Sequence, residues 1–152
     1  MKRAQDLIDH KGGSLITISS DATIQDAVKL MVAKKIGAIL IEDDEKIVGI
    51  WTERDLLRNS LVDSFDPGKA RIGDFMTKEL ITVDVSENIY RMMDKFLGLR
   101  LRHLPVEKDG KIVALLSAGD VIKAALYDKT KEFDELNEMV SWEYYENWRW
   151  SK

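Results

Sequence analysis

A hydroxyl residue followed three positions later by an aspartate occurs twice in the sequence, as Thr52 with Asp55 and as Ser117 with Asp120. Apolar runs precede both hydroxyls, so a buried strand would deliver each hydroxyl to its first exposed position, with the acid in the first turn of a following helix. Such a pair can bind the vicinal diol of a ribose. Free backbone N–H groups at the helix start could also attract phosphate. We call these pairs the first motif and the second motif.

The same spacing is also typical of a helix cap. A Ser or Thr before a helix and an acid at its third position form a capping box, and an acid in the first turn is favourable to the helix dipole whatever its function. Either motif alone therefore favours a structural role. The recurrence of the pair after a Lys-Ile-Val strand shifts the balance toward a functional one.

The two motifs belong to a duplication that spans most of the chain. Residues 16–61 align with residues 81–126 without a gap, and Asp120 follows Asp55 at the constant offset of 65 positions. Self-similarity at a fixed period indicates a duplicated structural unit. We therefore expect two copies of one local fold, and a site that is made once should be made twice.

Each copy predicts the order strand, helix, strand, strand, helix. In the first copy, a short β-branched run over 16–18 precedes a helix over 24–32 whose apolar stripe should be buried. Two strands over 38–41 and 46–51 follow, joined by a four-residue polar turn, and a second helix begins after Thr52. The second copy repeats this order. The predicted fold class is therefore α+β, built from two βαββα repeats.

Three segments lie outside the copies. Residues 1–15 form a polar leader, and the stretch around Pro67 and Gly68 is typical of a linker. An aromatic-rich tail starts at Asp128 and has apolar residues at helical spacing. Clustered large rings seldom stay in water, so we expect a helix that docks on the module itself, on a second copy of the chain or on a partner protein.

Composition narrows the function classes. The net charge is −4, from 23 basic and 27 acidic residues that are interleaved, so bulk electrostatics do not indicate nucleic-acid binding. The absence of cysteine excludes a disulfide, a thiolate metal site and a cysteine nucleophile, and it suits a reducing cytoplasm. Charged residues interrupt the apolar positions of residues 1–11, so neither a signal peptide nor a membrane helix is expected.

The sequence offers no signature of catalysis. His10 and His103 are the only histidines and show no ligand-like spacing with acids, so no metal site is expected. The nucleophile elbow of hydrolases, the phosphate-binding loop and the dinucleotide fingerprint are all absent. We predict that the chain is not an enzyme, although magnesium could arrive with a nucleotide.

With these features the chain resembles the cystathionine β-synthase-type (CBS) domain family. The resemblance covers about residues 7–127 and recurs in both copies. The segments that carry it are Ile16-Thr17-Ile18, residues 46–55, Phe75-Met76-Thr77 and residues 102–120.

The resemblance implies two CBS domains packed as a pseudo-twofold unit, often called a Bateman module. It places CBS domain 1 at residues 7–62, a linker at 63–75, CBS domain 2 at 76–127 and the C-terminal helical tail at 128–152. Such modules are regulatory and in many relatives bind AMP, ADP, ATP or S-adenosylmethionine in clefts between the domains. The resemblance therefore implies a stand-alone sensor that forms a homodimer and relays binding of an adenosyl ligand to a protein partner. The absence of cysteine adds the expectation that it is cytoplasmic.

The resemblance also assigns ligand-binding residues by type of contact. Both motifs would hold ribose, the backbone of two edge strands would face adenine, and basic side chains would contact phosphate. The assigned residues are Thr52, Asp55, Ser117 and Asp120 for ribose, Thr17, Ile18, Thr82 and Val83 for adenine, Met76 on the approach to the second edge strand, and Arg54, Arg102 and His103 for phosphate.

The two copies differ at the phosphate end. Arg102 and His103 correspond to Gly37 and Ala38 in the first copy, so the two sites cannot bind phosphate equally. We expect one strong site and one weak or empty site.

Other departures keep alternatives open. Ala114 stands where the first copy has Gly49, and Gly119 stands in place of Arg54, so the second motif could hold a ligand or only cap its helix. Trp51 could line the first site or be a core or interface aromatic. The alternative function is a ligand-free dimerisation and protein-interaction module in which the acids merely cap helices.

Overall fold

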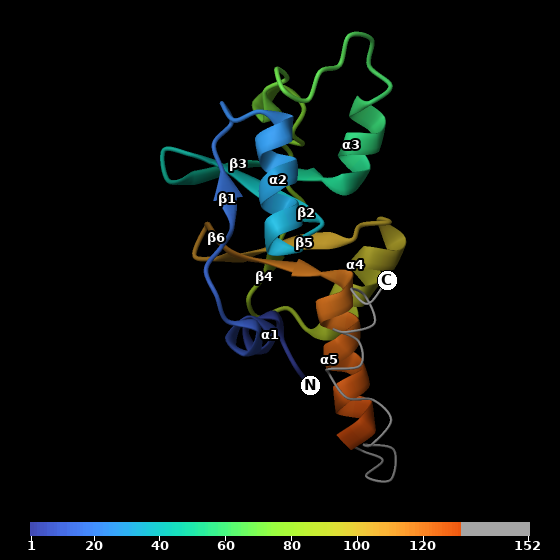
Figure 1. Ribbon diagram of the computed structural model, residues 1–152. Helices are drawn as coiled ribbons and strands as arrows, with labels where there is room; N and C mark the ends of the chain where they lie inside the picture. The colour runs from blue at the N-terminus through green and yellow to red at the C-terminus, as the bar shows by residue number, and fades with distance from the viewer. Residues whose placement is uncertain (132–152) are drawn as a thin grey trace. The chain divides into compact units, whose positions relative to one another are not determined.

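The computed structural model describes residues 1–131, and the chain divides into two compact units (Figure 1). Among the described residues, the first unit comprises residues 14–81 and 109–113, and the second unit comprises residues 1–13, 82–108 and 114–131. Residues 132–152, which hold most of the predicted aromatic tail, lie outside the described part of the chain.

The first unit is a small three-stranded sheet with helices from the same repeat. Strand β1 is parallel to β2, β2 is antiparallel to β3, and the strand order is β1-β2-β3. Helix α2 packs on β2, and α3 follows directly from the end of β3. The elements are β1 (Thr17–Ile18), α2 (Ile24–Lys34), β2 (Ala38–Asp43), β3 (Lys46–Thr52), α3 (Glu53–Asn59) and the short 3-10 helix η1 (Ile72–Asp74).

The second unit repeats this order and adds a helix at its start. Its sheet has the order β4-β5-β6, and α5 packs against both α4 and α1. The elements are α1 (Ala4–Lys11), β4 (Val83–Asp84), α4 (Ile89–Gly98), β5 (His103–Lys108), β6 (Lys111–Ser117) and α5 (Ala118–Lys131). The α+β class and the doubled βαββα order predicted from the sequence are confirmed.

Backbone dihedrals follow the duplication residue by residue. Positive φ angles occur at Lys35 and at its counterpart Arg100, and again at Asp44 and Asp109. The hairpin turns are tighter than predicted, because the strands run on until only two residues with positive φ remain between them. This backbone twist suits two-residue hairpins.

Capping residues and apolar spacing explain the helices after the edge strands. Thr23 caps α2 by accepting a hydrogen bond from the Asp26 backbone, and the same helix buries Ile24, Ala27 and Met31. The prediction that the whole stripe is buried was wrong at its end, since Val32 is 73% exposed. Its counterpart in α4, Leu97, is 77% exposed.

Each unit is completed by the segment that precedes the other repeat. In the second unit, the Ala4 N–H donates to the Glu87 carbonyl at 2.8 Å, and the Ile89 N–H donates to the Lys2 carbonyl at 3.2 Å. In the first unit, the linker segment around η1 does the same for α2, with Ile24 N–H donating to the Ala70 carbonyl at 2.9 Å.

The predicted polar leader is therefore part of a folded unit. Ala4 and Leu7 of α1 are buried among the apolar residues of β4, α4, β5, β6 and α5. The core of the first unit gathers residues of α2, β2, β3 and η1, namely Ile24, Ala27, Met31, Ile39, Ile41, Trp51 and Ile72. Among the described helices, none has the length and apolar character needed to span a membrane.

Candidate functional site

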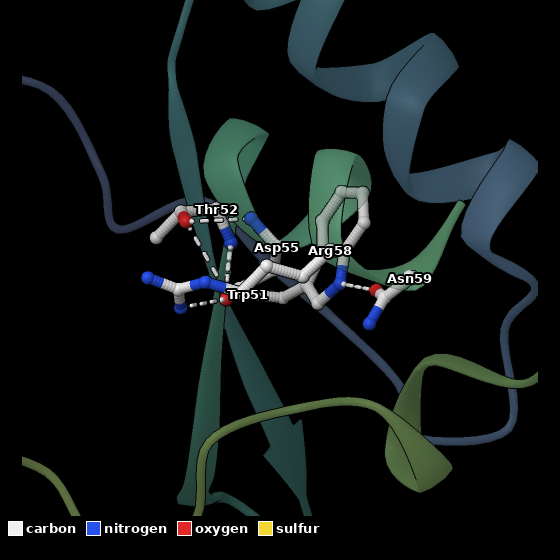
Figure 2. Close-up of polar contacts among 5 residues, drawn as sticks. All are labelled: Trp51, Thr52, Asp55, Arg58 and Asn59. Atoms are coloured by element: carbon white, nitrogen blue, oxygen red, sulfur yellow. Dashed lines mark hydrogen bonds and ion pairs between the residues drawn. The ribbon is translucent and has the colours of Figure 1, made fainter. Parts of the chain in front are cut away.

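The first motif is held by a closed set of local hydrogen bonds (Figure 2). The Thr52 hydroxyl oxygen accepts from the Asp55 N–H at 3.3 Å, and Asp55 Oδ2 accepts from the Thr52 N–H at 2.8 Å and from the Thr52 hydroxyl at 3.1 Å. Arg58, one turn along α3, lies 3.4 Å from Asp55 Oδ1. The Asp55 side chain is 14% exposed and the Arg58 side chain is 74% exposed, so the carboxylate is mostly enclosed while its guanidinium partner is solvated.

Trp51, the residue before the first motif, is part of the core and forms a hydrogen bond with the last residue of α3. Its indole is fully buried in the core of the first unit, and its Nε1–H donates to the Asn59 carboxamide oxygen at 2.9 Å (Figure 2). This bond ties the end of β3 to the last residue of α3. The core interpretation of Trp51 is therefore correct.

The second motif repeats the cap but differs in what holds the acid. Asp120 Oδ2 accepts from the Ser117 N–H at 2.8 Å, and the Ser117 hydroxyl accepts from the Asp120 N–H at 3.1 Å. The same Oδ2 atom lies 3.0 Å from Nζ of Lys11, the last residue of α1. Lys11 also donates to the Leu115 carbonyl at 3.2 Å.

The edge strands differ in how much of their polar surface is occupied. In the second unit, Thr82 lies directly before β4 and not in the edge strand as predicted; its hydroxyl donates to Glu107 at 3.3 Å and its carbonyl accepts from Lys95 Nζ at 3.3 Å. The counterpart Thr17 in β1 makes no side-chain hydrogen bond within residues 1–131. In both sheets the strand lies at an edge, paired on one side only, with Ile18 opposite Ile41 and Val83 opposite Val106.

The residues predicted for phosphate lie at the entrance to the motif helices. The Arg102 carbonyl accepts from the Ala118 N–H at 2.8 Å, and the Gly37 carbonyl accepts from the Glu53 N–H at 3.0 Å, so Arg102 and Gly37 hold equivalent places. A Cβ at Gly37 would lie 3.2 Å from a Glu53 carboxylate oxygen. The second unit thus has an arginine where the first has a glycine beside an acid.

His103 opens β5, directly after Arg102, and Arg54 is an exposed residue of α3. The Met76 thioether packs against the Gly49 backbone of β3: a Cβ at Gly49 would lie 2.5 Å from Met76 Sδ and 3.0 Å from the Thr77 carbonyl oxygen. Met76 therefore lies with the first motif's unit, although it precedes the second edge strand in sequence.

The twelve predicted residues fall into two sets of six. The first unit holds Thr17, Ile18, Thr52, Arg54, Asp55 and Met76, and the second unit holds Thr82, Val83, Arg102, His103, Ser117 and Asp120. Each unit therefore contains an edge strand, a hydroxyl and an acid of its own, with the edge strand and the strand that carries the motif on opposite sides of the middle strand.

Sequence reasoning missed two lysines and one further capping box. Lys11 and Lys95 reach polar groups of the second unit that the sequence pattern alone cannot connect to them. Thr23 and Asp26 form another capping box at the start of α2, which shows that the spacing by itself marks a cap. Within residues 1–131 no group of three or more His, Cys, Asp or Glu side chains is arranged to hold a metal ion.

Comparison with known proteins establishes the family. The model of the CBS domain matches residues 6–62 and 72–127, and the chain therefore belongs to the CBS-domain family with two copies of the domain.

Particular relatives extend over nearly all of the pair. The CBS domain-containing protein CBSX3, mitochondrial, of Arabidopsis thaliana is 34% identical over 144 residues, which cover 89% of this chain and 70% of the relative. The solved structure of a putative signal-transduction protein with CBS domains from Burkholderia ambifaria is 32% identical, with a TM-score of 0.79 over 84% of this chain and 96% of that one. CBSX2, solved in complex with AMP, is 28% identical with a TM-score of 0.70, over 85% of this chain and 99% of that one.

Several other curated relatives are longer proteins. The chain spans 39%, 23% and 22% of the length of three of them. In those proteins the region similar to this chain is a part of a larger polypeptide.

Proposed function

We propose that this CBS pair is a regulatory sensor that binds an adenosine-containing ligand, of the class of AMP, ADP, ATP or S-adenosylmethionine, and relays binding to a partner without catalysis. Its ligand-binding groups are the two motifs and the edge strand of the same unit. The absence of cysteine from the sequence fits a reducing compartment such as the cytoplasm.

The observation that carries the proposal is that each unit has a hydroxyl and a carboxylate at the end of the last strand of its sheet, β3 or β6, while the strand at the opposite edge, β1 or β4, is paired on one side only. A ribose diol requires hydrogen-bond acceptors, which the carboxylates supply, and an adenine edge can pair with backbone N–H and C=O groups. The similarity to CBSX2, solved with AMP, supports the same ligand class for this chain.

Phosphate recognition distinguishes the two units in this proposal. Arg102 stands in the second unit where the first unit has Gly37 under the Glu53 carboxylate. A guanidinium stabilises phosphate by charge-assisted hydrogen bonds, whereas a carboxylate repels it. We therefore expect the groups of the second unit to contribute more to binding of a nucleotide than to binding of adenosine.

Thermal melting with AMP, ADP, ATP, S-adenosylmethionine and adenosine tests the proposal. A ligand at a hundredfold over its Kd adds about 2.7 kcal/mol of stability, which corresponds to a shift in Tm of roughly 5–10 °C for a protein of this size. The variants Asp55→Asn and Asp120→Asn remove the charge but keep an oxygen for the cap, so at least one of them should lower the shift.

Asp26→Asn is the matched control, because Asp26 occupies the same third position of a capping box in α2 and belongs to neither motif. Its ligand-induced shift should equal that of the wild type. A shift that survives in both motif variants would remove the ribose assignment, and the absence of a shift with every ligand would refute the sensor.

A second candidate function is a dimerisation and interaction module, and an apolar surface on α3 favours it. The helix has no buried residue; Leu57 within it is 70% exposed, and Leu61, two residues after its end, is 84% exposed. Exposed apolar groups of this kind are often covered by a partner. We propose that a second copy of the chain covers them. Light scattering of Leu57→Ser with Leu61→Ser should show a smaller mass than the wild type; an unchanged mass would exclude this surface.

A further inference from the structure

The second motif differs from the first in carrying a cation from outside its own repeat. Lys11 reaches Asp120 from a helix 109 positions away in sequence, whereas Asp55 is paired with Arg58 of its own helix. We propose that Lys11 limits ligand binding at the second motif: its ammonium group occupies the Asp120 carboxylate and must leave before a ribose diol binds there. This inference rests on the proposed function of the motif.

The acceptor positions of Asp120 show why Lys11 competes with a diol. An ionised carboxylate offers about four lone-pair positions, two on each oxygen. Oδ2 already accepts the Ser117 N–H and lies 3.0 Å from Lys11 Nζ, so both of its positions are used. A diol that binds the carboxylate in the bidentate manner donates one O–H to each oxygen, so the ammonium group takes the position on Oδ2 that the second hydroxyl needs.

The lysine is placed by the fold. The start of its helix is fixed by backbone hydrogen bonds to Val85 and Glu87, at 2.9 and 2.8 Å. Lys2 adds an ion pair with Asp128 at 3.4 Å and lies 4.3 Å from the centre of the Tyr127 ring. The N-terminal segment is thereby anchored to α5, the same helix that carries Asp120 in its first turn.

The equivalent carbonyl groups of the two units accept from different donors. In the first unit the Ile50 carbonyl accepts from the Thr77 backbone N–H at 2.8 Å, and in the second unit its counterpart, the Leu115 carbonyl, accepts from Lys11 Nζ at 3.2 Å. A side-chain ammonium has replaced a backbone N–H. Unlike a backbone group, this cation also reaches the motif acid, and it can leave without unfolding the edge of the sheet.

Exposure indicates that the contact can open. The side chains of Lys11 and Asp120 are 49% and 27% exposed, and Lys11 is followed by Gly12 and Gly13, both with positive φ. An ion pair at such a site contributes at most about 1 kcal/mol. Loss of the ammonium group should therefore raise affinity at the second motif by roughly two- to fivefold.

The test uses adenosine, which carries the diol without phosphate, in full-length protein. Asp55→Asn serves as the parent so that only the second motif is measured, and Lys11→Met is added to it. Calorimetric titration at low salt should give an adenosine Kd two- to fivefold lower in the double variant. Salt at about 0.5 M should bring the parent toward the double variant, because screening weakens the ion pair.

Lys34→Met in the same parent is the matched control. Lys34 is the last residue of α2, as Lys11 is the last residue of α1, it is exposed, and no ion pair involves it within residues 1–131. Its substitution makes the same change in net charge and should leave the Kd unchanged.

Four results would overturn the inference. An adenosine Kd that is unchanged or higher in the Lys11 variant shows that Lys11 does not compete, with the sensor function intact. Weaker binding of AMP with unchanged binding of adenosine shows that Lys11 contacts phosphate instead. If adenosine binds the wild type but neither Asp55→Asn protein, the second motif takes no ligand. Absence of binding to every protein, including the wild type, refutes the proposed function and this inference with it.

Discussion

The first and second motifs have the same cap and different surroundings. In both, a hydroxyl at the end of a strand accepts from the backbone of the acid, and the acid accepts from the backbone of the hydroxyl residue, at 2.8 Å in each case. Asp55 is then paired within its helix by Arg58, while Asp120 is paired by Lys11 from α1. The duplicated sequence thus sets the geometry of the motif, whereas the cation that pairs the second carboxylate comes from residues 1–15, outside the two copies.

The same contrast holds one step further from the acid. The residue before each motif is fully buried, but it is Trp51 in the first unit and Leu116 in the second. The strand that leads into the motif also differs. In the first unit Gly49 lets Met76 pack against the backbone, and in the second unit the equivalent residue is Ala114, which packs against the core. Two copies of one fold have therefore been packed in different ways, which gives matched substitutions for separating general from local effects.

The largest expected effect is at the buried residue before each motif. Trp51→Ala should lower the free energy of unfolding by about 3–5 kcal/mol, and Leu116→Ala by about 2–5 kcal/mol. The loss at Trp51 should be the larger of the two, because it also leaves Asn59 without the indole donor. Urea denaturation measures both, with Leu97→Ala, at a 77% exposed position, as a control that costs under about 0.5 kcal/mol. Equal losses would mean that the indole adds nothing specific to the first unit.

A smaller effect is expected from exchanging the small residues of β3 and β6, the strands that lead into the two motifs. Gly49→Ala places a Cβ 2.5 Å from Met76 Sδ and 3.0 Å from the Thr77 carbonyl, so it should cost about 1–3 kcal/mol. Ala114→Gly should cost only about 0.5–1 kcal/mol, since it creates no clash. Met76→Ala in the Gly49→Ala background should recover part of the loss, measured as a coupling energy in a double-mutant cycle. The absence of coupling would show that the Thr77 backbone, and not the thioether, excludes a side chain.

The smallest expected effect is a loss of stability at low pH. The Ser20 hydroxyl and backbone N–H hold the pKa of Asp43 below its usual range in the first unit, and Ser86 does the same for the pKa of Asp84 in the second. A lowered pKa in the folded state means that the ionised form stabilises the fold; this contribution is present above the ordinary pKa of about 3.9 and is lost as the pH falls through the folded value.

Asp43→Asn should therefore reduce stability at pH 7 and make no difference at the lowest pH at which the protein still folds. Asp84→Asn should behave in the same way. Thermal melting from pH 7 to about pH 3 measures both variants against the wild type. A destabilisation by Asp43→Asn that is constant over this range would show that Ser20 binds the neutral side chain equally well.

Much of the fold followed from local patterns. The β-branched runs, the apolar spacing of residues 24–32 and the polar turn predicted the elements of both repeats in the right order, because strand and helix periods are properties of neighbouring residues. The turn was predicted too long and the stripe too wide at Val32. Both errors concern element ends, where a few backbone dihedrals and the surrounding packing decide.

The identity of the site residues could be predicted from the sequence, but their burial and their distant contacts could not. The capping geometry of Thr52 with Asp55 is local and follows from the spacing, whereas the burial of Trp51 in the core depends on α2, β2 and η1 and could only be one of two alternatives from sequence. The contribution of Lys11 had no sequence signal, since it stands in a segment without periodicity and contacts a residue of the other end of the chain.

By itself, the sequence determined that one unit occurs twice, with the same strand order, the same positive φ positions and the same capped acid, because these properties depend on residues a few positions apart. Only the tertiary structure decided that residues 1–13 complete the second repeat and that the linker completes the first. The path of the chain selects these contacts, so a duplicated motif acquires one acid paired within its own helix and one paired by a distant lysine.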